Sequence, residues 1–110
     1  MTRARLFTRM MLNSEISVMT RMHDMLEHDG VQDRAEFSDM MAAVMQNGRL
    51  DPRALAGDLG YNLSSVYRWV DGSSAPHPVG WSKVVDWVVA ALAKRIEQLH
   101  EQNEPAEASA

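Results

Sequence analysis

The chain reads DPRALAGDLGYNLSSVYRWVDG at residues 51–72. This stretch contains two short helical patterns separated by a glycine. Asp51 is a natural N-cap, and Pro52 suits the first position of a helix that ends at Gly60. A second helix is expected to begin near Asn62 and to end at Gly72, because glycine after the last turn is a common helix stop. The stretch therefore predicts two helices joined by a tight turn.

The second of these helices has two different faces. Val66 and Trp69 share one side of a helical wheel, whereas Ser64 and Arg68 point the opposite way. The small side chain of Ala56 allows the first helix to cross the second closely. This spacing is typical of a helix-turn-helix, in which the second helix enters a DNA major groove.

The segment resembles the lambda-repressor-like (Cro-family) helix-turn-helix. The positions that match the family pattern without a gap are Leu55, Ala56, Leu59, Gly60, Val66, Trp69, Gly72 and Pro76. The resemblance extends more loosely over residues 33–99. It implies a compact all-helical fold and a dimeric repressor that occupies a near-palindromic operator in double-stranded DNA.

The resemblance also implies functional residues at the start and on the outer face of the second helix. Arg68 would bond a guanine edge with two donors. The residues expected to read bases are Leu63, Ser64, Tyr67 and Arg68. The residues expected to contact phosphates are Arg53, Asn62, Ser65, Ser73, Ser74 and Lys83, with Arg49 as a weaker candidate.

Two longer helices are expected to complete the domain, which spans residues 31–102. Residues 34–47 contain one apolar stripe, preceded by a capping pattern of Asp33 and Glu36 and followed by a stop at Asn47-Gly48. A single long helix is expected from between Pro78 and Ser82 to about Gln102. Its second apolar stripe predicts an interface with a second copy or with the N-terminal region: Val84, Trp87 and Ala91.

The N-terminal extension, residues 1–30, carries six of the nine methionines. Residues 1–12 are expected to form a mobile basic arm, and a methionine-rich helix is expected to begin at Asn13-Ser14, to end at Asp29-Gly30 and to dock near Trp87. Residues 103–110 are expected to be a disordered tail.

Composition excludes several classes of protein. The 110 residues include no cysteine, which excludes disulfides, thiolate zinc sites and cysteine nucleophiles. No apolar run approaches the roughly 20 residues needed to span a bilayer, and no signal-peptide pattern is present, so a cytoplasmic protein is expected. Enzyme motifs are absent and no cofactor is expected. His23 and Glu27 are interpreted as a surface pair rather than as metal ligands.

A second interpretation is a protein-interaction module on the same scaffold, such as an antiactivator or an antitoxin-like partner protein. The net charge of −4, the acidic stretch 23–51 and the methionine-rich N-terminus favour it. In this case the N-terminal helix or the long C-terminal helix would bind a partner protein.

Overall fold

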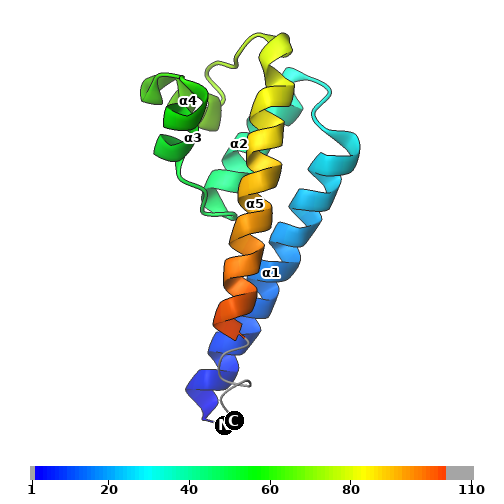
Figure 1. Ribbon diagram of the computed structural model, residues 1–110, viewed down its shortest axis with the longest axis vertical. Coiled ribbons are helices and arrows are strands. Elements are labelled where there is room, and N and C mark those ends of the chain that lie inside the picture. Colours follow the sequence, from blue (N-terminus) through cyan, green and yellow to red (C-terminus); the bar gives the residue numbers. More distant parts are fainter. Residues whose placement is uncertain (1, 104–110) are drawn as a thin grey trace.

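The computed structural model describes residues 2–103, and the regular secondary structure of this part of the chain is all helical (Figure 1). The helices are α1 (Arg3–Asp29), α2 (Arg34–Gln46), α3 (Pro52–Leu59), α4 (Leu63–Asp71) and α5 (Trp81–Asn103), and a short 3-10 helix, η1 (Pro78–Gly80), precedes α5. The all-α prediction is confirmed. Within the described residues, no helix combines the length and the apolar character that crossing a membrane requires.

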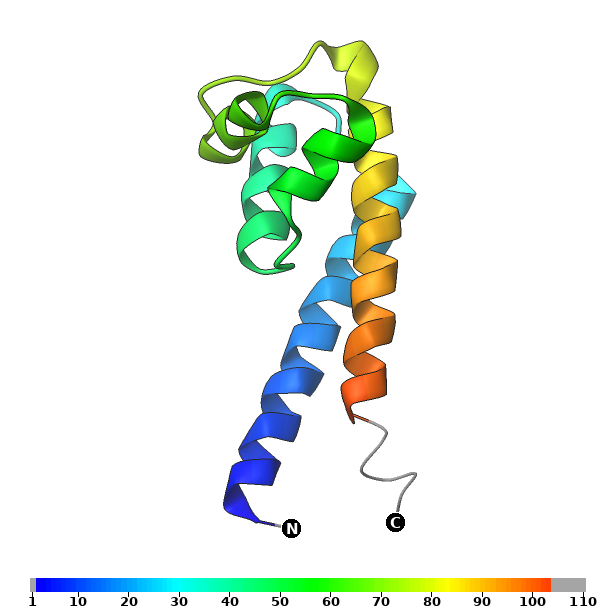
Figure 2. The ribbon, with the colours of Figure 1, turned by 60° about the vertical axis from the view of Figure 1, so that its left-hand side comes forward.

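Two long helices form the axis of the molecule. α1 and α5 lie side by side, whereas α2, α3 and α4 gather near the start of α5 (Figures 1 and 2). We call α2–α4 and the segment up to η1 the head. The molecule measures 51 × 26 × 20 Å, and the N-terminal half of α1 extends away from the head.

The helices of the head begin where the N-cap patterns predict. The Asp33 carboxylate accepts from the Glu36 N–H at 2.9 Å, and the Asp51 carboxylate accepts from the Arg53 N–H at 2.9 Å. The return bond of the first cap differs from a standard capping box, because the Glu36 carboxylate accepts from the Gln32 N–H, at 2.6 Å.

Glycines in the left-handed region of φ end α3 and α4. Gly60 has φ 75° and Gly72 has φ 82°, a conformation that strains most other residues. The tight turn after α3 and the stop after α4 therefore follow from local chemistry, as the sequence predicts. The expected single long C-terminal helix is also confirmed as α5.

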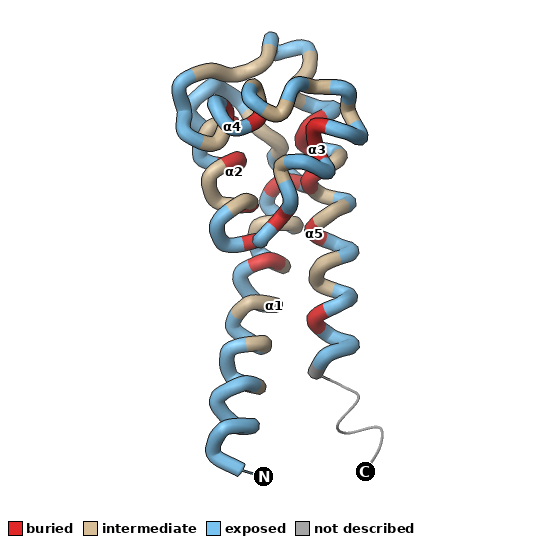
Figure 3. The backbone as a smooth tube through the Cα atoms, turned by 90° about the vertical axis from the view of Figure 1, so that its left-hand side faces the viewer, coloured by how far each residue is buried: buried red, intermediate tan, exposed pale blue. Residues whose placement is uncertain are grey.

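An aromatic cluster holds the head to the start of α5. Phe37 is completely buried between Trp69, with ring centroids 5.9 Å apart, and Trp81, also at 5.9 Å. Trp69 makes a second edge contact with Tyr61, at 4.8 Å. The core continues from this cluster down the contact between α5 and α1, where Met19 of α1 is completely buried (Figure 3).

The predicted mobile arm is wrong. Residues 3–12 belong to α1, which begins after Thr2, whose hydroxyl accepts from the Arg5 N–H at 3.3 Å. The helix runs through Asn13 and Ser14 without a break. No glycine or proline interrupts residues 2–29, and the arginines, leucines and methionines there are good helix formers. The expected end at Gly30 is confirmed, with φ 64°.

The C-terminal prediction lies mostly outside the described part. Asn103, assigned to the tail, is the last residue of α5, and residues 104–110 lie outside the described residues.

Candidate functional site

The outer face of α4 is open to solvent, as the sequence predicts. Val66 is 0% exposed and Trp69 is 3% exposed, so these two side chains anchor the helix to the head. On the opposite side, Ser64, Tyr67 and Arg68 are exposed. Three of the four residues expected to read bases therefore lie together on one accessible surface.

Leu63 differs from the other three. Its side chain is half-buried and packs against the core, so only part of it faces outward. The N-terminus of α4 is otherwise open: Asn62 is exposed and its side chain makes no capping hydrogen bond. Ser65, one turn further on, is half-buried.

The segment after α4 folds back onto its last turn. The Arg68 carbonyl accepts from the N–H groups of Ser73, at 3.0 Å, and Ser74, at 3.3 Å. The Asp71 carboxylate accepts from the Ser73 N–H at 2.8 Å. Hydrogen bonds from Ser73, with a smaller contribution from the charge of Arg68, lower the pKa of Asp71.

Arg34, which no sequence motif indicated, also belongs to this surface. Its guanidinium, from the first residue of α2, donates to the Ser73 carbonyl at 3.3 Å. The two residues are 39 positions apart. Only the packing of α2 against α4 brings them together, so no local pattern could have identified Arg34.

The remaining predicted phosphate contacts lie in different environments. Lys83 donates to the Leu59 carbonyl at 3.3 Å and lies 5.6 Å from the ring centre of Tyr61, so it supports the turn between α3 and α4. Arg53 is exposed in the first turn of α3. Arg49, the weaker candidate, lies 3.7 Å from the Glu15 carboxylate and therefore faces α1.

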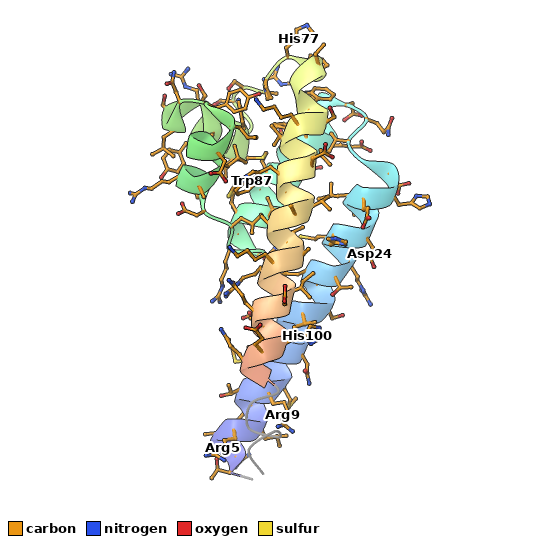
Figure 4. All side chains as sticks on the ribbon, viewed as in Figure 1. Arg5, Arg9, Asp24, His77, Trp87 and His100 are labelled. Atoms are coloured by element: carbon orange, nitrogen blue, oxygen red, sulfur yellow. The ribbon has the colours of Figure 1, made fainter. Side chains whose placement is uncertain are left out.

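The predicted interface on α5 needs correction. Val84 is 0% exposed within this chain and has no surface to offer a partner. The Trp87 indole N–H donates to the Asp58 carboxylate at 2.8 Å, so this side chain joins α5 to α3 rather than to α1 (Figure 4). Ala91 is half-buried. The second apolar stripe of α5 exists because α5 packs against the head on one side and against α1 on the other.

The one group in the described residues whose ligand atoms could hold a metal ion is His23, Asp24 and Glu27, within 4.8 Å of one another. His23 lies 2.9 Å from the adjacent Asp24 and 3.5 Å from Glu27, one helical turn away. These are ordinary contacts between neighbours on a helix surface.

Comparisons with protein-family models, with curated proteins and with solved structures find no match for this chain.

Proposed function

We propose that this chain is a sequence-specific DNA-binding transcriptional regulator with a lambda-repressor-like head, and that it represses by occupying its operator as a dimer. The observation that carries the proposal is the division of α4 into a buried face, Val66 and Trp69, and an open face, Ser64, Tyr67 and Arg68. A helix held from behind and open in front is what major-groove reading requires.

The proposed roles follow from side-chain chemistry. Arg68 donates two hydrogen bonds to a guanine edge, and Ser64 donates to or accepts from a base. Tyr67 and the exposed part of Leu63 supply apolar contacts. Arg53 and Arg34 contact phosphates on either side, which fixes the register of α4 on the duplex.

The charge balance of this surface predicts selective rather than indiscriminate binding. Residues 51–72 contain two arginines and three aspartates. Each aspartate accepts a hydrogen bond from within the chain: Asp51 from Arg53, Asp58 from Trp87 and Asp71 from Ser73. The two phosphate contacts per chain, from Arg53 and Arg34, predict that log K falls against log salt with a slope near −2 per protomer.

The test begins with DNA fragments recovered from a random-sequence pool, followed by titration at two salt concentrations. Arg68→Ala should relax the preference at one base pair by about 1–3 kcal/mol. Arg53→Ala should weaken binding similarly on every sequence. The control is Lys94→Ala, which removes an exposed basic side chain on α5 and should change neither property. Binding to the selected fragments no tighter than to random duplex would overturn the proposal.

A second candidate function is protein interaction without DNA reading. The observation that favours it is an apolar groove between α1 and α2, lined by Met22, Met25 and Met40 and bordered by the acidic Asp39. Methionines make adaptable contacts and are common on surfaces that bind protein helices. Under this alternative, Arg68→Ala would have no effect on the binding of the partner protein.

A further inference from the structure

The outer side of α1 carries an exposed apolar stripe. At its N-terminal end the Arg3 guanidinium lies 5.9 Å from the centre of the Phe7 ring. Met11 is 64% exposed, Val18 is 43% exposed and Met25 is 61% exposed. These residues are seven positions apart, which is close to two helical turns, so they lie on one side of the helix. Phe7, 53% exposed, extends the stripe toward the N-terminus. The α5-facing side of α1 is a different one, marked by the buried Met19.

The stripe leads into the groove between α1 and α2. Met25 belongs to both, and the groove, of about 200 Å³, is lined almost entirely by apolar atoms. Asp39 is its one charged lining residue. A mainly apolar surface, interrupted by Ser14 and Arg21, therefore runs from the exposed end of α1 to the head.

The charges along α1 are opposite at its two ends. Residues 2–14 contain Arg3, Arg5 and Arg9 and no acidic residue. Arg5 and Arg9 lie on the projecting half of α1 (Figure 4). Residues 24–39 contain six acidic residues against the single Arg34. A parallel neighbour of the same sequence would place arginines against arginines, whereas an antiparallel neighbour places the basic end against the acidic end.

We propose that a second copy of this chain covers the stripe, through an antiparallel pairing of the two α1 helices about a two-fold axis near residue 16. A knobs-into-holes register then sets Phe7 opposite Met25 of the partner subunit, at the groove, and Ser14 opposite Val18 of the partner subunit. The same register brings Arg3 to the height of Asp29 of the partner subunit along the pair, on the other side of the contact line. Contacts of this kind are self-complementary, so one surface serves both copies.

In this proposal α1 supplies the interface of the dimer that the proposed function requires. Only the consequence for DNA binding rests on the proposed function. α1 has 27 residues and is therefore about 40 Å long. Because each head sits at the C-terminal end of its α1, the antiparallel pair places the two heads at opposite ends. Two α4 helices placed in this way are available to separate major grooves of one duplex.

The first experiment measures mass by sedimentation equilibrium of the full chain at micromolar concentration, where a dimer is expected. Val18→Glu places a charge in the middle of the pairing and should raise the dimer dissociation constant by at least about 100-fold. The matched control is Val79→Glu, at a residue of η1 that is 81% exposed, which should leave the mass unchanged. A monomeric wild-type chain, or an unchanged dimer with Val18→Glu, would overturn the proposal.

The second experiment determines the direction and register of the α1 pairing by disulfide cross-linking. Because the chain has no cysteine of its own, any disulfide must join introduced cysteines. Phe7 and Met25 are 18 residues apart on one helix, so two cysteines there lie about 27 Å from each other and form no bridge within one chain. The variant Phe7→Cys/Met25→Cys should form disulfide-linked dimers on mild oxidation, whereas either single variant should not. A dimer cross-linked by Phe7→Cys alone would indicate parallel pairing and overturn the proposal.

DNA titration of the same variants separates the two proposals. If Val18→Glu is monomeric and loses affinity for the full operator but keeps weak half-site binding, both proposals are supported. If the cross-links form as expected and the wild-type chain prefers no sequence, the pairing stands and the DNA-binding proposal falls. If the chain binds its operator specifically while Val18→Glu still dimerises, the pairing falls and the DNA-binding proposal stands.

Discussion

The head and the projecting half of α1 use the same types of residue with opposite results. Phe37 in the head is 0% exposed, whereas Phe7 in α1 is 53% exposed, and Met41 and Met11 differ in the same way, at 0% and 64%. α2 and α1 both have apolar stripes with helical spacing. A stripe shows which side of a helix avoids water, but what covers that side depends on where the other helices lie.

The largest expected effect compares the two phenylalanines. Phe37→Ala empties a site between Trp69 and Trp81 and should lower the free energy of unfolding by about 3–5 kcal/mol. Phe7→Ala should lower it by less than about 0.5 kcal/mol in the monomer, because the exposed ring makes few contacts. Urea unfolding followed by tryptophan fluorescence, in the Val18→Glu background, measures both. Equal losses would show that Phe7 is covered within one chain and would break the comparison.

Two glycines in the head, Gly48 and Gly57, differ in the space around them, so alanine substitutions there should change stability in opposite directions. A Cβ at Gly48 would lie 2.7 Å from the Val44 carbonyl oxygen and 3.2 Å from Leu92, so Gly48→Ala should destabilise the chain by about 1–3 kcal/mol. Gly57, inside α3, has open space around its Cβ position, and Gly57→Ala should stabilise by about 0.5–1 kcal/mol. Thermal unfolding of the two variants should show shifts of opposite sign, and shifts of the same sign would contradict the packing at Gly48.

A smaller effect is expected where α5 meets α3. Trp87→Phe removes the indole N–H that donates to Asp58 while keeping an aromatic ring, and it should cost about 1 kcal/mol. A double-mutant cycle with Asp58→Ala isolates this bond, because the double variant should lose less than the sum of the two single losses. Fully additive losses would mean that the two side chains are not coupled in solution.

The smallest effect concerns Asp71 at the end of α4. Its pKa is lowered in the folded chain by hydrogen bonds from Ser73, so its contribution to stability is present above the unfolded carboxyl pKa and is lost as pH falls through the lowered folded value. Ser73→Ala should move the pKa of Asp71 back toward its ordinary value. Titration of the side-chain carboxyl by NMR measures this shift, and an unchanged pKa would exclude a role for the Ser73 hydroxyl.

Much of the head could be predicted from local patterns. Asp33 and Asp51 cap their helices, and Gly60 and Gly72 end theirs, because capping and left-handed backbone depend on residues a few positions apart. The open face of α4 was predictable for a similar reason, since Val66 and Trp69 lie on the side of the helix opposite Ser64 and Arg68.

Two predictions failed because they concerned neighbours distant in sequence. The N-terminal helix was expected to dock near Trp87, but Trp87 binds Asp58, 29 residues away, and Val84, expected at an interface, is enclosed by its own chain. A helical wheel gives the direction of a side chain relative to its own helix and carries no information on which helix lies there.

The sequence by itself determined where helices begin and end in the head, and which sides of them are apolar, because these properties depend on hydrogen bonds and side chains within about one turn. Only the tertiary structure decided that α5 packs both of its stripes against its own chain, that Arg34 reaches Ser73, and that the stripe on α1 remains open. These outcomes depend on the packing of segments far apart along the chain. Burial of apolar surface is favourable whichever segment provides the cover, so a local sequence pattern does not show which segment that is.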